Sequence, residues 1–369
     1  MKATGSSASE EHVTAGPEPS GRGPAEEGAS QGTTGEALPR VRVDLGRVSA
    51  KGRNAWVETL FGGIGPLLGA LLVLCILLTI TTETFLTTSN LLNVMVQISV
   101  VGIAAVGGTF VIITSGIDLS VGSNVALSGM VAAYAMKSDG ASGMVGILVA
   151  LVVGAAVGAF NGLSVTALRL TPFIATLAML AMGRGLTQQV SQGKTIFGFP
   201  DDFNFLGNGT IFGVQSPVII TLVVFAVGWF VLTKTTFGQQ VYAVGGNREA
   251  ARLAGISVQR VVFLVYVLAG LCAGLAGIVL SGRLNSALSS SATGLELQVI
   301  AAVVIGGTSL FGGRGSLVGT FIGALLIGVI NNGLTLLNVN PFWTQFVQGV
   351  VIFVAVLLDA LNQRRLGNG

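Results

Sequence analysis

Few residues in this sequence could perform acid–base, nucleophilic or metal chemistry. The single histidine, His12, lies in a polar N-terminal stretch, which excludes histidine-based metal sites, catalytic triads and proton shuttles. Cys75 and Cys272 each fall within an apolar segment, where a small packed residue is the ordinary interpretation. Neither a G-x-x-x-x-G-K-S/T phosphate loop nor a G-x-S-x-G nucleophile motif occurs. The sequence therefore predicts no enzyme activity, no metal site and no cofactor in this chain.

Four carboxylates lie near the apolar segments, at Glu83, Asp118, Glu296 and Asp359. Glu296 and Asp359 fall at segment ends, where water solvates a charge, whereas carriers driven by a proton or sodium gradient tend to bury carboxylates mid-span. Asp118 follows Gly116 at a predicted helix start, so we interpret it as an N-cap. The scarcity of buried carboxylates argues against a stand-alone ion-coupled carrier, which stays open as an alternative.

Side-chain amides supply the remaining polar chemistry of the apolar segments. An amide can face water or a sugar hydroxyl without the free-energy cost of a buried charge. Hydrogen bonding between helices explains the same residues equally well. The candidates for a translocation path are Asn93, Gln97, Gln298, Asn331, Asn332 and Gln345.

Composition indicates which elements position these residues. The 369 residues are 51% hydrophobic and 9% charged, with a mean hydropathy of +0.80 and 54 glycines, as is typical of a membrane protein. Apolar runs of about 20 residues predict an all-α polytopic protein with about ten transmembrane helices. The predicted spans are 61–82, 92–115, 118–136, 143–167, 172–190, 214–233, 259–281, 295–311, 315–337 and 342–360.

Two connections between predicted spans are very short. Gly116 and Ile117 separate the second and third spans, and a GGRG turn that includes Gly313 separates the eighth and ninth, so either pair could contain a re-entrant segment. Residues 103–123 also align with residues 300–320 at a constant offset of 197, with seven identities in 21 positions. We interpret this match as an internal repeat, which in transporters often flanks the substrate path.

The first 55 residues differ from the rest of the chain. They are rich in Gly, Ser, Glu and Pro and lack the apolar stretch of a signal peptide, so residues 1–55 are predicted to form a disordered tail and 56–369 the membrane domain. Fifteen basic residues fall on the side of the N-terminus, and only Lys137, Lys194 and Arg283 fall clearly on the other. We expect a multi-pass plasma-membrane protein in the lipid bilayer, with both termini in the cytoplasm and no nucleic-acid partner.

The stretch AVGGNREAARLAGISVQR, residues 243–260, lies on the predicted cytoplasmic side and carries four charges, at Arg248, Glu249, Arg252 and Arg260. Residues 248–254 favour a helix, and Gly255 is a natural residue to end it. Such a short amphipathic helix suits docking into a groove of a soluble partner. A charged loop that merely obeys the positive-inside rule is an equally good interpretation. The apolar face of the predicted helix contains Ala250, Leu253 and Ala254.

Four segments together resemble the permease subunits of ABC importers for ribose, xylose, arabinose and galactose. They are TFVIITSGIDLSVGS, LTPFIATLAMLAMGRGL, TTFGQQVYAVGGNREAARLAGISVQRV and IAAVVIGGTSLFGGRGSLVGTFIGALLIGVINNGL. The resemblance extends from about residue 61 to residue 359 and leaves the N-terminal tail unexplained. It implies the ABC importer permease fold and a path for a monosaccharide, with ribose or a related sugar as the expected cargo. A non-sugar solute such as a nucleoside stays open.

The resemblance also implies partners. They are an ATPase subunit that binds ATP and Mg²⁺, an extracytoplasmic sugar-binding protein, and a second permease copy, identical or paralogous. In such permeases a loop with a GGN-x-x-A-A-x-x-x-G-I pattern contacts the ATPase. The pattern places Gly245, Gly246, Asn247, Ala250, Ala251, Gly255 and Ile256 in the coupling loop, with Arg248, Glu249 and Arg252 among them.

Overall fold

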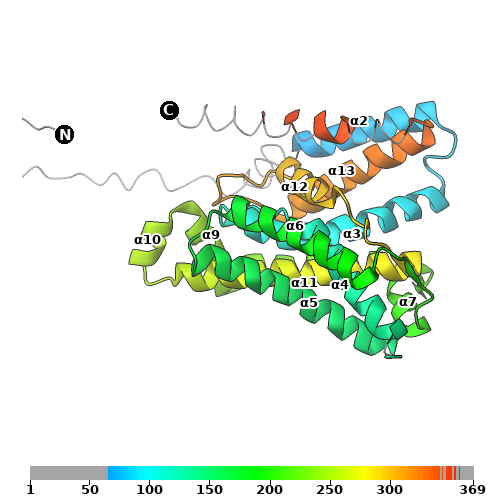
Figure 1. Cartoon of the computed structure of the whole chain (residues 1–369). Helices are drawn as coiled ribbons and strands as arrows, with labels where there is room; N and C mark the ends of the chain where they lie inside the picture. The colour runs from blue at the N-terminus through cyan, green and yellow to red at the C-terminus, as the bar shows by residue number, and fades with distance from the viewer. Residues whose placement is uncertain are drawn as a thin grey trace, which may run out of the picture. The chain divides into compact units, whose positions relative to one another are not determined.

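The computed structural model describes residues 65–138, 140–340, 343, 346–350, 353–354 and 357. Within these residues the chain is a bundle of α-helices with four two-residue strands (Figure 1). The all-α class predicted from the sequence is confirmed. The predicted tail, residues 1–55, lies outside the described residues.

The helices follow the apolar segments in order. Long Leu-, Val-, Ile- and Ala-rich runs form helices because a helix satisfies its own backbone hydrogen bonds in an apolar medium. Their bounds are α2 Gly65–Thr81, α3 Thr88–Ile113, α4 Val121–Ser138, α5 Gly143–Thr166, α6 Pro172–Ser191, α7 Asp201–Asn208, α8 Ser216–Lys234, α9 Thr236–Gly246, α10 Arg248–Leu253, α11 Val258–Leu284, α12 Leu295–Ile305 and α13 Leu317–Leu336.

In the described part of the chain, five helices are long and apolar enough to cross a membrane, namely α3, α5, α8, α11 and α13. Helices occupy nine of the ten predicted spans, and most of the tenth, 342–360, lies outside the described residues. Helix α12 has only 11 residues in place of the predicted span 295–311. At about 1.5 Å per residue its length is roughly half the thickness of the hydrocarbon core, so this helix by itself is too short to cross a membrane.

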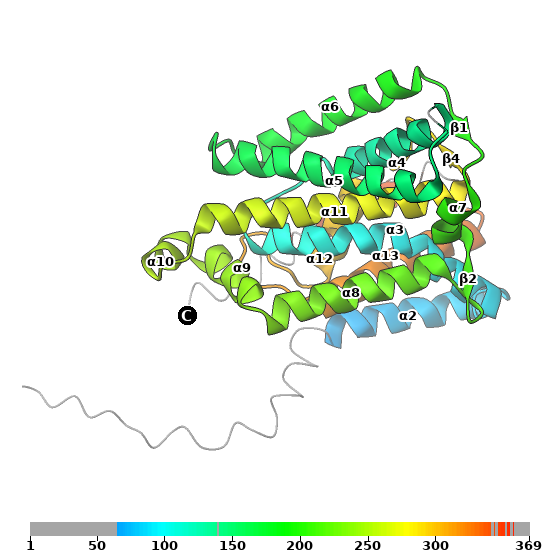
Figure 2. The ribbon, with the colours of Figure 1, turned by 90° about the horizontal axis from the view of Figure 1, so that it is seen from below.

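Helix α3 lies at the centre of the bundle, with 94% of its most apolar window buried. Figure 2 shows α5, α11, α3 and α8 as successive rows, with α6 beyond one side and α2 beyond the other. Two glycine pairs bring α5 and α11 together, because a Cβ atom on Gly154 would lie only 2.5 Å from the carbonyl oxygen of Gly270 and 2.8 Å from Cα of Gly274. Backbones that approach this closely compensate for the missing hydrophobic drive between helices in lipid.

The two ends of the bundle differ (Figure 2). The hairpin end carries α7, the antiparallel pair of β1 (Ile196–Phe197) with β4 (Ser286–Ala287), and the hairpin of β2 (Thr210–Ile211) with β3 (Val214–Gln215). The loop end carries α9 and α10. Asp202 in α7 accepts a hydrogen bond of 3.1 Å from the backbone N–H of Met144, in the first turn of α5. This bond ties the hairpin end to the bundle.

Two non-helical connections are stabilised by side chains. Asp118 accepts hydrogen bonds from the backbone N–H of Ser120 at 2.8 Å and from its hydroxyl at 2.6 Å. Because α4 begins only at Val121, Asp118 stabilises the turn before the helix, which corrects the predicted N-cap role. Between α11 and α12, Arg184 donates to the carbonyl oxygens of Ser291 at 2.6 Å and Ala292 at 3.0 Å.

Candidate functional site

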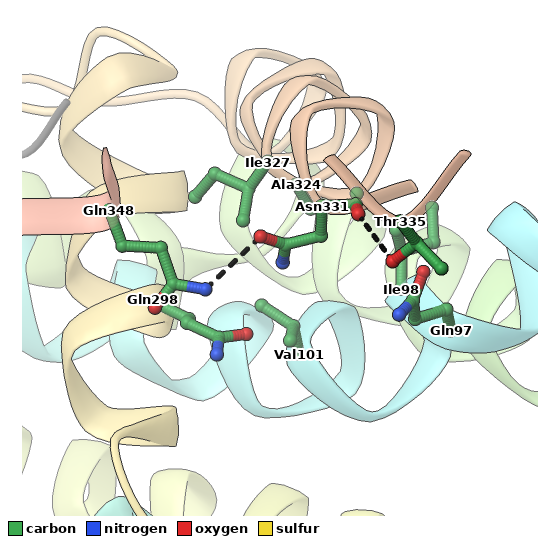
Figure 3. A pocket seen from close by; sticks show the side chains of 10 residues that line it. Gln97, Ile98, Val101, Gln298, Ala324, Ile327, Asn331, Thr335 and Gln348 are labelled. Atoms are coloured by element: carbon green, nitrogen blue, oxygen red, sulfur yellow. Dashed lines mark hydrogen bonds between the residues drawn. The ribbon is translucent and has the colours of Figure 1, made fainter. Parts of the chain in front are cut away.

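A cavity of about 260 Å³ lies between α3, α12, α13 and the helical segment that includes residues 346–350 (Figure 3). Gln97 enters it from α3, Gln298 from α12, and Asn331 from α13. These three amides were predicted from the sequence as candidates for a translocation path. The other residues that line the cavity are Ile98, Val101, Ala324, Ile327, Gly328, Thr335 and Gln348.

The cavity has a polar but uncharged wall. Gln348 donates from Nε2 to Oδ1 of Asn331 at 3.1 Å, and the hydroxyl of Thr335 donates to the carbonyl oxygen of Asn331 at 2.9 Å (Figure 3). Among the described residues that line the cavity, none is charged and none is aromatic. Amides both donate and accept hydrogen bonds, so the wall can bind a hydroxyl group either as a donor or as an acceptor.

The other predicted path residues lie elsewhere. Asn332 is buried and exchanges hydrogen bonds with Asn90 of α3, so it serves helix packing rather than the cavity. Asn93 is exposed and does not line the cavity, and Gln345 lies outside the described residues. Gln348 lines the cavity but is not among the predicted path residues, although it lies three residues after the predicted Gln345 in the sequence, which is a helical spacing. This spacing was the signal that could have found it.

The predicted coupling stretch forms a short helix at the loop end. Helix α10 begins after Asn247, whose side-chain oxygen accepts a hydrogen bond of 3.0 Å from the backbone N–H of Ala250. Gly255 follows the helix with φ +82°, a conformation that glycine adopts without strain. The N–H of Ile256 bonds back to the carbonyl oxygen of Ala251 at 3.0 Å and closes the helix end.

The ten predicted coupling residues divide between two faces. Gly245 and Ala251 are buried against the bundle. The side chains of Glu249 and Arg252 are 75% and 67% exposed and form an ion pair of 3.0 Å. Leu253, which is not one of the ten, is 81% exposed on the same helix. The other exposed members are Gly246, Asn247, Arg248, Ala250 and Gly255, while Ile256 is partly buried.

Two predicted turn residues, Gly313 and Gly116, make close contacts with other segments. Gly313 has φ +74° and packs against Cα of Gly246, where a Cβ atom would lie 2.9 Å away. Gly116 packs against Tyr266, whose hydroxyl oxygen a Cβ atom would approach to 2.9 Å. Both glycines are therefore needed for close contact, and Ser115, beside Gly116, adopts the left-handed conformation with φ +60°.

An apolar bundle whose described part holds five helices long enough to cross a membrane has the architecture of a multi-pass membrane protein. Residues 90–356 match the family model described as the permease component of a branched-chain amino acid transport system. The chain belongs to this family of transport-system permeases.

Curated relatives cover most of the chain. The ribose import permease protein RbsC of Escherichia coli K12 is 47% identical over 298 residues, which is 80% of this chain and 92% of that protein. RbsC of Bacillus subtilis 168 is 46% identical, with the same shares of both chains. The D-allose transport system permease protein AlsC of E. coli K12 is 40% identical over 290 residues, which is 79% of this chain and 89% of that protein. No solved structure gives a significant match.

Proposed function

We propose that this chain is the membrane permease subunit of an ABC importer and provides the path for a monosaccharide, ribose or a closely related sugar. The cavity of about 260 Å³ with its amide-rich wall carries this proposal. The relatives that import ribose and allose support the same cargo class. In this proposal the chain itself is not an enzyme and binds neither ATP nor a metal ion, because a separate ATPase subunit binds ATP and Mg²⁺.

The wall chemistry favours a sugar over the other candidate solutes. A free amino acid carries a carboxylate and an ammonium group, which need charged or strongly polarised partners when they leave water. Protein sites for a nucleoside base usually stack it on an aromatic side chain. The described wall of the cavity offers neither charges nor rings, whereas Gln97, Gln298 and Asn331 supply both donors and acceptors for neutral hydroxyls.

The exposed face of α10 is the proposed docking site for the ATPase. Leu253 presents an apolar side chain to solvent. Its exposed fraction is 81%, so it makes little contact with the described chain. The ion pair of Glu249 with Arg252 lies beside it. A helix that docks into a groove of a partner typically presents apolar anchor side chains, with charged residues at the edge of the contact.

The proposed orientation places the loop end in the cytoplasm, as it does both termini. Most basic residues of the described chain lie at or next to helix ends at the loop end, which fits the positive-inside rule. They are Arg169, Lys234, Arg248, Arg252, Arg260 and Arg314. Three others lie toward the hairpin end, namely Lys137, Lys194 and Arg283. The hairpin end then faces an extracytoplasmic sugar-binding protein. A second permease copy, identical or paralogous, completes the proposed assembly.

Reconstitution in liposomes tests the proposal. The chain together with the ATPase subunit and the sugar-loaded binding protein should accumulate ribose or a related sugar when ATP is present. The chain alone should neither hydrolyse ATP nor accumulate sugar in a proton or sodium gradient. Accumulation by the chain alone in an ion gradient would replace this proposal with the ion-coupled carrier.

A further inference from the structure

A stretch of irregular backbone lies well inside the bundle. It is the α11–α12 segment, residues 288–294, which follows β4 at the hairpin end and precedes α12. Figure 1 shows this part of the chain returning from the end that carries α7 to the middle of the bundle, where α12 lies. Its sequence, LSSSATG, is rich in hydroxyl groups and lacks the apolar character of a span after Leu288.

Contacts with α4 and α6 fix the depth of the segment. Arg184, which donates to the carbonyl oxygens of Ser291 and Ala292, lies twelve residues after the first residue of α6 and seven before its last. A Cβ atom on Gly122 would lie 2.6 Å from the carbonyl oxygen of Ala292. Gly122 precedes the hairpin end of α4 by sixteen residues, or about 24 Å at 1.5 Å per residue. Ala292 therefore lies at the depth of the hydrocarbon core and not at an end of the bundle.

Backbone donors of the segment are left unpaired at this depth. The N–H groups of Ala292, Thr293 and Gly294 make no hydrogen bond within the described part of the chain. The side chains of Ser290 and Thr293 are exposed. Irregular backbone at membrane depth is stable only where protein covers it or water fills the space beside it, because lipid cannot satisfy its N–H groups.

Arg184 determines which way these donors point. The carbonyl group and the N–H group of a trans peptide unit point in opposite directions. Because Arg184 binds the carbonyl oxygens of Ser291 and Ala292, the N–H groups of Ala292 and Thr293, which belong to the same two peptide units, point away from it. Ala292 has φ +56°, an uncommon conformation for a residue other than glycine, and the bond from Arg184 at 3.0 Å helps to hold it.

The segment leads to the cavity. The N–H of Gln298 donates to the carbonyl oxygen of Gly294 at 3.3 Å, so Gln298 lies one helical turn beyond the segment on the same face. Gln298 is one of the amides that line the cavity. The unpaired donors therefore lie between the hairpin end and the cavity.

We infer that the α11–α12 segment forms the part of the sugar path between the hairpin end and the cavity. It is a water-filled entry in which the N–H groups of Ala292 and Thr293 bind sugar oxygens, and Arg184 is the positioning residue that directs them there. Sugar hydroxyl and ring oxygens accept hydrogen bonds from such donors without any charge. This inference rests on the proposed function as a sugar permease.

Cysteine accessibility tests whether water reaches the segment. The full-length permease, with Cys75 and Cys272 replaced by alanine, is reconstituted in liposomes as Thr293→Cys or as Leu186→Cys. Leu186 is the matched control, since it is 50% exposed and lies two residues from Arg184 on α6, at the edge of the bundle (Figure 2). A charged methanethiosulfonate reagent modifies thiolates in water, so Thr293→Cys should react about tenfold or more faster than Leu186→Cys. Equally slow modification would mean that lipid or a second permease copy covers the segment, and would overturn the inference.

Protection by sugar tests whether the entry belongs to the path. Thr293→Cys leaves the backbone donors in place, and a bound sugar should exclude the reagent from them. An excess of ribose should therefore slow its modification about threefold or more, whereas sucrose at the same concentration should not. A rate that ribose leaves unchanged, or that sucrose lowers equally, would contradict a sugar path along this segment.

Arg184→Lys in the Thr293→Cys background tests the positioning role. An ammonium group cannot bind both carbonyl oxygens as the guanidinium group does, so the ribose concentration for half protection should rise about fivefold or more while the thiol stays reactive. An unchanged concentration would remove Arg184 from this role. If Arg184→Lys fails to fold, the comparison of Thr293→Cys with Leu186→Cys still decides the inference, because both retain Arg184. Protection by ribose without ATP-driven uptake by the complete assembly would instead overturn the proposed function alone.

Discussion

Asn90 and Asn332 exchange two hydrogen bonds between α3 and α13. Nδ2 of Asn90 donates to Oδ1 of Asn332 at 3.0 Å, and Nδ2 of Asn332 donates to Oδ1 of Asn90 at 2.8 Å. Both side chains are buried in an apolar surrounding, where a lone amide would be costly. The pair therefore fixes the two helices in one register beside the cavity.

The first prediction concerns this pair. Asn332→Leu should lower the free energy of unfolding by about 1–2 kcal/mol because it leaves Asn90 without its partner. The double variant Asn90→Leu with Asn332→Leu should recover part of the loss. Thermal unfolding in detergent measures both, with the exposed Asn93→Leu as the control. Equal stability of wild type and Asn332→Leu would contradict a structural role for the pair.

The second prediction concerns the cavity. Gln298→Leu and Asn331→Leu should each lower the initial rate of sugar uptake about fivefold or more, because each removes a hydrogen-bonding group worth about 1 kcal/mol. Their unfolding temperatures should stay close to that of wild type, in contrast to Asn332→Leu. Uptake is compared at equal membrane abundance, again with Asn93→Leu as the control. Normal uptake in both variants would remove the cavity from the path.

The third prediction concerns docking at α10. Leu253→Asp should weaken binding of the ATPase subunit about tenfold or more, since it replaces an apolar anchor that burial would stabilise by about 1.5–3 kcal/mol. Insertion into the membrane should be unaffected because Leu253 is exposed. Titration of the ATPase against the purified permease measures the affinity. Phe212→Asp, an equivalent change at an exposed residue of the hairpin end, should bind as wild type does.

The fourth prediction concerns orientation. Single cysteines at positions 212 and 253, in a background where Cys75 and Cys272 are alanine, occupy exposed sites at the two ends, since Phe212 is fully exposed and Leu253 is 81% exposed. An impermeant maleimide added to intact cells should label position 212 and should label position 253 only after permeabilisation. The reverse pattern would invert the proposed orientation.

The fifth prediction concerns the glycine contact of α5 with α11. Gly154→Val should greatly reduce the yield of folded protein, because its side chain would collide with the backbone of Gly270 and Gly274. Gly69→Val in α2 is the control, since nothing lies within 4 Å of a Cβ atom there. The fraction of monodisperse protein after detergent extraction measures the effect. Similar yields for the two variants would contradict this packing.

The positions of the long helices could be predicted because lipid requires apolar runs of a fixed minimum length. The end of α12 could not be predicted from hydropathy. The chain has no charged residue between Ile305 and the glycines that follow, and hydropathy does not indicate where a helix ends. Helix α9 was missed for a related reason. Its sequence, TFGQQVYAVGG, mixes polar and apolar residues without the composition of a span.

The candidate site shows a similar division. The sequence left two interpretations open for the amides, and neighbouring residues now separate them: Asn331 faces the cavity while Asn332 bonds to Asn90. Successive residues on a helix differ by about 100° in direction, so packing alone decides which residue faces which neighbour. Gly245 illustrates the same limit, because the sequence does not tell which side of the last turn of α9 faces the bundle.

Arg184 recognises the connection between α11 and α12 through its carbonyl oxygens rather than its side chains. Every residue type at positions 285–294 would supply the same carbonyl oxygens. Homologues should therefore tolerate side-chain substitutions there, provided that the backbone conformation is conserved. Arg184 itself should resist exchange even for lysine, because the two nitrogens of the guanidinium group reach two oxygens at once. Saturation mutagenesis should therefore show that most substitutions at positions 285–294 preserve function. Substitutions of Arg184, about a hundred positions earlier in the chain, should not.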